Sequence, residues 1–129
     1  ASRNHHMFSD ISAWFYRALA GLRPDPETPG FKHAIVRPHP VGDLTWVKAW
    51  HESPYGRIAS AWEVTDGAFV LETTVPPNTT ATLALPTTAL EQVEHEGEAL
   101  AAGRLAEGRA CVDVASGTHR FRLPWSAHA

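Results

Sequence analysis

The first segment of the chain has apolar residues at helical spacing. They follow an i, i+3, i+4, i+7 pattern, which places them on one stripe of an α-helix. These residues are Ile11, Trp14, Phe15, Ala18, Leu19 and Leu22. Ser9 or Asp10 can cap the start of the helix, and Gly21 followed by Pro24 can end it. Because such a short helix is marginal without tertiary packing, we expect its aromatic stripe to lie against another part of a protein.

The pattern changes after this segment. Residues 23–30 contain three prolines and a final glycine, which stop a helix and favour a semi-rigid connector. Beyond it the apolar period becomes two, and short β-favouring runs alternate with turn signals. The predicted strands are 34–37, 44–52, 57–64, 68–75, 80–85, 92–96, 110–115 and 118–123. Asp66-Gly67 suits a tight hairpin, because glycine readily takes the positive φ required there.

These elements predict a mainly β fold. About eight strands joined by hairpin-length turns favour an antiparallel β-sandwich, preceded here by one amphipathic α-helix. Residues 98–107 are rich in alanine and could form a helical turn, but the glycines in and around this stretch favour a loop. We therefore divide the chain into a helical segment (1–23), a Pro-rich linker (24–30) and a sandwich domain (31–126).

Composition narrows the classes of partner. The apolar fraction of 43% and the five tryptophans indicate a globular protein. The net charge is −3 and the basic residues are scattered, which argues against nucleic acid as a partner. No apolar run approaches the length of about 20 residues that spans a bilayer, so we expect no membrane partner.

The cysteine and the N-terminus say little about the compartment. The single cysteine, Cys111, lies in an alternating strand, where a small core residue is the expected role. It has no partner for a disulfide, and the N-terminus lacks the layout of a signal peptide. The cytoplasm is slightly favoured, although a longer parent protein could carry a signal upstream.

The polar cluster at the N-terminus has two interpretations. His5 and His6 before Met7 could be the remainder of an affinity tag. Alternatively, a loop leading into a capped helix is suited to present a polar side chain to a ligand. The two histidines are adjacent and point in different directions, so we predict neither a metal site nor any cofactor.

The tryptophans of segment 44–52 are also ambiguous. Trp46, Lys48 and Trp50 share one side of the predicted strand, because side chains at i, i+2 and i+4 point the same way. Exposed, the two indoles could stack on sugar rings; buried, they would fill the sandwich. Burial is favoured, since exposed tryptophan pairs are uncommon, and Trp62 fits the same core.

Several motifs resemble the C-terminal part of bacterial α-L-rhamnosidases of glycoside hydrolase family 78. They are Asn-His-His-Met-Phe at 4–8, with Ala-Trp-Phe-Tyr-Arg at 13–17; Leu-Thr-Trp at 44–46, with Ser-Pro-Tyr-Gly-Arg-Ile-Ala-Ser at 53–60; and Val-Pro-Pro-Asn-Thr-Thr-Ala at 75–81. Residues 116–121 resemble the last hairpin of that family. The similarity spans nearly the whole chain.

The resemblance implies an enzyme that removes terminal α-L-rhamnose from glycosides with inversion. Its acidic residues lie in an (α/α)6 barrel followed by a C-terminal β-sandwich, so the predicted helix would be the last barrel helix and the sandwich would pack against the barrel. By position, His5 would contact the rhamnose as a hydrogen-bonding residue. After Phe8, this chain has Ser9-Asp10 where relatives often have glycine.

No catalytic residue is assigned within this chain. Glycoside cleavage requires two carboxyl groups at the scissile bond, and the family's acidic residues belong to segments upstream of Ala1. The acidic residues of the sequence read instead as a connector or a solvated strand and turn: Asp25, Glu27, Glu91, Glu94, Glu96 and Glu98.

Three hypotheses follow from these observations. The first is an inactive C-terminal piece of a rhamnosidase. The second is a stand-alone carbohydrate-binding module that uses Trp46 and Trp50. The third is a structural cap on the barrel, whose helical segment leaves an apolar patch and causes self-association.

Overall fold

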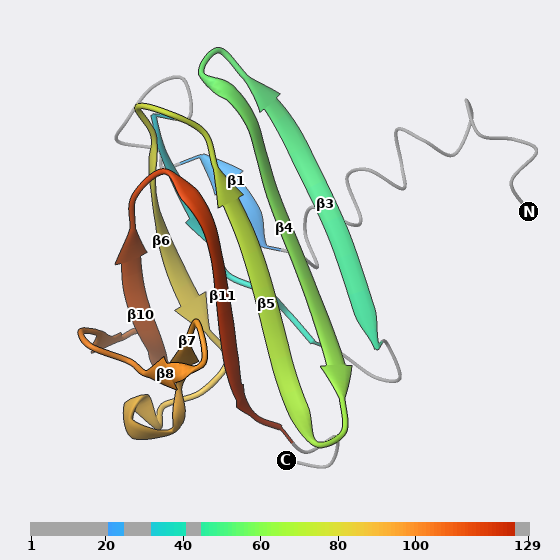
Figure 1. The fold of residues 1–129 in the computed structure, drawn as a ribbon, viewed down its shortest axis with the longest axis vertical. Coiled ribbons are helices and arrows are strands. Elements are labelled where there is room, and N and C mark those ends of the chain that lie inside the picture. Colours follow the sequence, from blue (N-terminus) through green and yellow to red (C-terminus); the bar gives the residue numbers. More distant parts are fainter. Residues whose placement is uncertain (1–20, 25–31, 41–44, 126–129) are drawn as a thin grey trace, which may run out of the picture.

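Two β-sheets packed face to face make up the fold (Figure 1). The computed structural model describes residues 21–24, 32–40 and 45–125. Sheet A has the order β1 (Leu22–Pro24), β2 (His33–Val36), β6 (Thr80–Leu85), β10 (Arg109–Val114) and β9 (Arg104–Ala106). Sheet B has the order β3 (Trp46–Ser53), β4 (Gly56–Thr65), β5 (Ala68–Val75), β11 (Gly117–Pro124), β7 (Glu94–His95) and β8 (Glu98–Ala99). The prediction of a mainly β sandwich is confirmed.

The core lies between the inner faces of the two sheets. Strand β4 alternates, so that Ile58 and Trp62 point inward and are 0% and 1% exposed. Trp62 stacks on Phe69 with ring centroids 5.6 Å apart, and Phe121 of β11 is equally buried. Cys111 is buried and free, as predicted for a small apolar residue, but it alternates with Ala110 and Val112 of the core cluster and lies on the other face of sheet A. Burial of such large side chains contributes roughly 1.5–3 kcal/mol each relative to exposure, and it fixes the register of the strands that carry them.

All eight predicted strands occur, with ends shifted by up to two residues. Among the described strands, every pair is antiparallel except β2 and β6, which are parallel. The 3₁₀ helix Leu90–Gln92 precedes the short β7. The sandwich is therefore mixed at one position in sheet A rather than wholly antiparallel.

The prediction of a loop over 98–107 holds for residues 100–103 and is wrong for the strands on either side of them. This stretch contains β8 and β9, each of which belongs to a tight hairpin. The two-residue connections are Glu96-Gly97 and Glu107-Gly108, and all four residues have positive φ. The same geometry occurs at the predicted Asp66-Gly67 hairpin, with φ of 52° and 75°. Positive φ at both central residues identifies type I′ turns, whose twist matches the flanking strands.

Residues 22–24, where the sequence predicts the end of a helix and the start of a linker, form strand β1. Leu22–Pro24 is extended and pairs antiparallel with β2, so these residues belong to sheet A rather than to a helix and a linker. Leu22 is buried in the core, because it follows Gly21 in a left-handed conformation (φ 75°) that turns the chain into the sheet. Residues 1–20 and 25–31 lie outside the described residues, and the three-part division of the chain stays a prediction.

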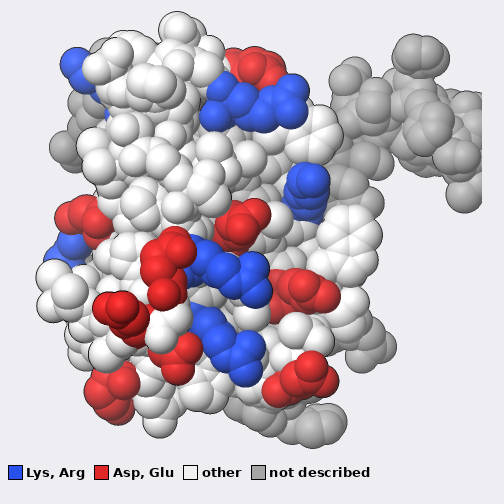
Figure 2. Space-filling view, viewed as in Figure 1, with Lys and Arg blue, Asp and Glu red and all other residues white. Residues whose placement is uncertain are grey.

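Acidic and basic side chains are interspersed on the face that sheet B presents in Figure 2, with no broad area of one sign. Such a surface lacks the clustered basic residues that bind a phosphate backbone. Within the described part of the chain, no helix has the length and apolar character needed to cross a bilayer.

Candidate functional site

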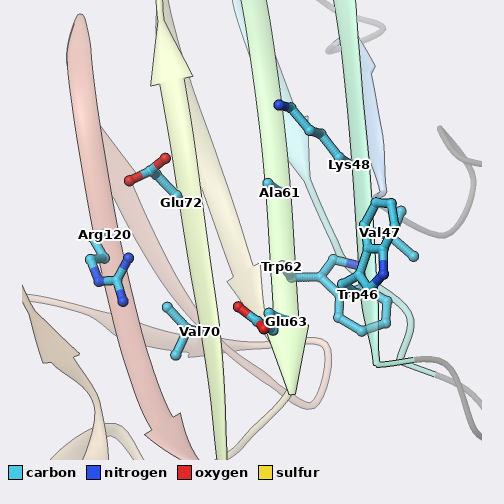
Figure 3. Close-up of a pocket in the computed structure, with 9 residues that line it drawn as sticks. All are labelled: Trp46, Val47, Lys48, Ala61, Trp62, Glu63, Val70, Glu72 and Arg120. Carbon is cyan, nitrogen blue, oxygen red and sulfur yellow. The ribbon is translucent and has the colours of Figure 1, made fainter. Parts of the chain in front are cut away.

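The outer face of sheet B carries a groove of about 270 Å³ (Figure 3). The register of the neighbouring strands creates it. Trp46 on β3 lies opposite Glu63 on β4. Lys48 on β3 lies opposite Ala61 on β4, and Ala61 in turn lies opposite Glu72 on β5. The row ends at Arg120 on β11, opposite Glu72. Because the methyl group of Ala61 is small, the longer side chains of the neighbouring strands rise around it. The volume is close to the lower end of about 300–1,000 Å³ for small-molecule pockets.

The two indoles on β3 are exposed, so the prediction that they are buried is wrong. Trp46 is 63% exposed and Trp50 52%, whereas Val47 and Ala49 between them are buried. The buried indole in this part of the core is that of Trp62 on β4, which lies opposite Val47. Register decides between the two faces of a strand, and sequence alternation alone does not.

The two indoles differ in their surroundings. Trp46 lines the groove, together with the underlying Trp62. Trp50 instead lies under the guanidinium of Arg57, whose Cζ is 5.4 Å from the ring centroid. Arg57 Nε donates to Glu52 Oε2 at 2.6 Å, which holds the guanidinium in place. One face of Trp50 is therefore covered by a cation, and Trp46 is the indole that offers a surface to a ligand.

Two carboxylates line the groove, Glu63 on β4 and Glu72 on β5. Both side chains are exposed and project to the same side of one sheet (Figure 3). Each carboxylate can accept hydrogen bonds from a ligand in the groove.

A polar network crosses the outer face of sheet A. His33 Nε2 lies 2.8 Å from Thr82 Oγ1, which donates to Asp113 Oδ1 at 2.7 Å. Arg104 Nη1 donates to Asp113 Oδ2 at 2.9 Å. The hydrogen bond from Thr82, together with the Arg104 bond and charge, holds the pKa of Asp113 below its usual value. The network ties β2, β6, β10 and β9 together and has a structural role.

Arg109 also has a structural role. Its Nη1 donates to the backbone oxygens of Pro38 and Ala84, at 2.6 and 3.0 Å. Burial, followed by the positive charge of Arg37, lowers the pKa of Arg109. The side chain satisfies two carbonyl groups of adjoining segments, which is a stabilising contact rather than a ligand site.

A third group of polar residues was not recognised in the sequence. Potential ligand atoms of His95, Glu96 and His119 all lie within 4.8 Å of one another. The histidines are 24 positions apart, and only the pairing of β7 with β11 brings them together. His5 and His6, the candidates from the sequence, lie outside the described residues.

Comparison with known proteins places the chain in a family. The family model described as "Bacterial alpha-L-rhamnosidase C-terminal domain" matches residues 21–100. An α-L-rhamnosidase of Streptomyces avermitilis is 34% identical over 122 residues, which cover 95% of this chain and 12% of the relative. One from Formosa agariphila is 35% identical over 103 residues, with coverage of 80% and 11%. The chain thus spans about one eighth of the relatives' length or less.

Solved structures give the same result. The crystal structure of the Streptomyces avermitilis α-L-rhamnosidase complexed with L-rhamnose matches with a TM-score of 0.73 and 33% identity, over 90% of this chain and 11% of that one. The α-L-rhamnosidase from Dictyoglumus thermophilum matches with a TM-score of 0.75 and 31% identity, over 92% and 14%. Fold, sequence and family model agree, and the chain belongs to the bacterial α-L-rhamnosidase C-terminal domain family.

Proposed function

We propose that this chain is the C-terminal sandwich domain of an enzyme that hydrolyses terminal α-L-rhamnosides, and that it supports the catalytic domain. The observation that carries the proposal is the restricted match: relatives named α-L-rhamnosidase align with this chain over only 9–12% of their length. The bond-breaking carboxylates then belong to the remaining part of the enzyme. The sandwich packs against that part and stabilises it.

The test compares the 129-residue chain with a longer protein that includes the upstream part of the enzyme. On an aryl α-L-rhamnoside, we expect turnover from the longer protein and none from the chain. Glu63→Gln and Glu72→Gln in the longer protein should leave kcat unchanged. Clear turnover by the chain alone, lost in either variant, would overturn the assignment of catalysis to the upstream part.

His5 is proposed as a sugar contact of the longer enzyme, on the basis of its position in the Asn-His motif. Loss of one hydrogen bond to a neutral sugar costs roughly 0.5–1.5 kcal/mol, so His5→Ala should raise KM by about tenfold or less. His6→Ala is the neighbouring control and should have a smaller effect. Equal kinetics for the two variants would remove His5 from the binding site.

A second candidate function is the binding of a neutral sugar in the groove on sheet B. The exposed Trp46 favours it, because an indole face pairs with the C–H face of a pyranose while nearby charged groups reach its hydroxyls. Lys48, Glu72 and Arg120 line the same groove and supply donors and acceptors on both sides. The occupant that fits is a single monosaccharide unit such as rhamnose.

Tryptophan fluorescence of the chain titrated with L-rhamnose tests this function. Trp46→Ala should lower the affinity at least tenfold, whereas Trp50→Ala should have little effect because Arg57 already covers that ring. If neither variant changes the titration, the groove is not a sugar site. If Trp46→Ala instead lowers the stability of the longer protein only, the indole is a contact with the catalytic domain.

A further inference from the structure

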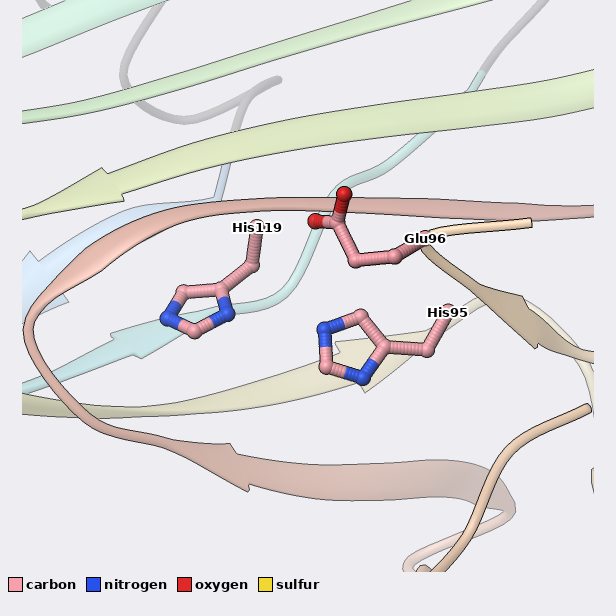
Figure 4. A group of neighbouring side chains, drawn as sticks. All are labelled: His95, Glu96 and His119. Carbon is pink, nitrogen blue, oxygen red and sulfur yellow. The ribbon is translucent and has the colours of Figure 1, made fainter. Parts of the chain in front are cut away.

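Three metal-ligating side chains meet where the β7–β8 hairpin joins strand β11 (Figure 4). His95 lies opposite Phe121 in the register, and His119 precedes Phe121 by two residues on the same inward face. Glu96 follows His95 at the first position of the hairpin turn. Figure 4 shows one ring nitrogen of each imidazole directed toward the other, with the carboxylate of Glu96 beside them.

His95 carries a nitrogen with no assigned role. Its Nε2 atom is buried, and no donor or acceptor within the described part of the chain reaches it. The ring is held rigidly, since it stacks on Phe121 with centroids 4.4 Å apart and planes 8° from parallel. A buried imidazole nitrogen without a partner is costly, and a metal ion is one partner that removes the cost.

His119 is oriented in the way expected of a metal ligand. Its Nε2 lies 2.8 Å from the backbone oxygen of Ala115. Because a carbonyl oxygen only accepts hydrogen bonds, Nε2 carries a proton, and in the neutral imidazole Nδ1 then has the lone pair. A backbone carbonyl on the outer nitrogen is a common device for fixing the tautomer and orientation of a metal-binding histidine.

Glu96 is anchored as well. Its backbone N–H donates to Arg120 O at 2.9 Å, and its Oε2 accepts from the Arg120 backbone N–H at 2.8 Å. The carboxylate therefore lies against β11 while its other oxygen stays available. The three groups come from two strands and one turn, and each is fixed by a contact outside the cluster.

We propose that His95 Nε2, His119 Nδ1 and a carboxylate oxygen of Glu96 bind a divalent transition-metal ion of the Zn²⁺ class. Two imidazoles and one carboxylate suit Zn²⁺, whereas Mg²⁺ and Ca²⁺ prefer oxygen ligands alone. Ligands of a tetrahedral Zn²⁺ lie roughly 3.4 Å apart, so shifts of about 1 Å, shared among the three side chains, would bring the ligand atoms to bonding distance while the stack and hydrogen bonds keep their orientations. Water or a group from another domain completes the fourth position. The ion would link the β7–β8 hairpin to β11.

Calorimetric titration of the metal-free chain with Zn²⁺ tests the site, in a background with His5→Ala and His6→Ala so that the N-terminal pair does not contribute. We expect one ion per chain and an increase in the thermal midpoint. His119→Gln should lower the affinity about 100-fold or more, and Glu96→Gln about tenfold or more. His95→Phe keeps the ring stack on Phe121 and should lower binding as His119→Gln does.

The matched control is Glu107→Gln. Glu107 occupies the same turn position in the β9–β10 hairpin, with φ of 52° against 56° for Glu96, and it is not one of the three clustered residues. This variant should bind Zn²⁺ as the parent does. Binding that survives His95→Phe and His119→Gln, or no binding by the parent, would overturn the proposal. Near-ultraviolet circular dichroism confirms that each variant is folded.

Discussion

At the scale of single residues, Gly21 is a position where backbone geometry permits no side chain. A Cβ atom there would lie 1.8 Å from the backbone oxygen of Arg37, and Arg37 N donates to Gly21 O at 3.0 Å. The clash is with backbone, which has no rotamer to change. Gly21 thereby fixes the start of β1 against the end of β2.

We predict that Gly21→Ala lowers the free energy of unfolding by about 3 kcal/mol or more, measured by urea denaturation. Gly67→Ala is the control, because Gly67 has the same φ of 75° and nothing within 4 Å of its Cβ position. It should show only the cost of a left-handed conformation, about 1–2 kcal/mol. Equal losses in the two variants would show that the contact with Arg37 does not matter.

Thr73 has a fully buried hydroxyl without a hydrogen-bond partner in the described structure. Thr73→Val replaces it with a methyl group of similar size, so we predict a gain of about 1 kcal/mol in the free energy of unfolding. Thr74→Val is the neighbouring control: its hydroxyl lies 3.3 Å from that of Thr118, and we expect little change or a small loss. A loss at Thr73 measured by urea denaturation would show that its hydroxyl has a partner after all.

At the scale of elements, the Asp113 network contributes stability that depends on pH. The pKa of Asp113 is lowered in the fold, so its contribution is present above the unfolded value of about 3.9 and is lost as pH falls through the folded value. Asp113→Asn should reduce stability at pH 7 by about 0.5 kcal/mol, because the pair with Arg104 is largely exposed.

Thermal denaturation between pH 2 and pH 7 checks this prediction. The difference between the parent chain and Asp113→Asn should disappear at the acidic end, where the carboxyl group is protonated in both states. The exposed Glu91→Gln serves as the control for a simple change of charge. A difference that is constant over the whole range would exclude a protonation effect.

Elements with a long period-two pattern could be predicted from the sequence, and very short ones could not. Strands such as β3 and β4 alternate over enough residues to define a face. Strand β7 lies inside the predicted run 92–96, whereas β8 and β9, with two and three residues, are too short to show any period. The turn between β7 and β8 was also not recognised, since Glu96 occupies a position that Asn, Asp or Gly normally fills.

For the candidate sites too, local sequence patterns could be predicted, whereas contacts that depend on strand pairing could not. Alternation predicted that Trp46 and Trp50 share a face, but which face is buried depends on the register with Trp62. The contact between His95 and His119 depends on a strand pairing with no local sequence signal. The motifs at residues 53–60 and 75–81 predicted the family correctly, because a resemblance does not require the contacts to be known.

At the scale of the whole molecule, β3 is a long edge strand with two exposed indoles. Lys48 separates Trp46 from Trp50 on its outer side, and a charge at such a position discourages pairing with another copy. Lys48→Val would create a continuous apolar stripe. We predict self-association at concentrations where the parent is monomeric, measured by size-exclusion chromatography with light scattering.

Lys32→Val is the control, because Lys32 is exposed outside the edge strand and carries the same charge. It should behave as the parent does. Equal behaviour of both variants would mean that net charge, rather than the position on β3, governs association.

The place of β1 in sheet A has a mechanical consequence. A pull on the chain from its N-terminal side loads the three-residue ladder between β1 and β2 before it reaches the rest of the sandwich. A load directed along the strand axis is shared by the three paired residues, because all of them are in register with β2. Since Leu22 is buried in the core, a displacement of β1 would reach the interior of the sandwich directly.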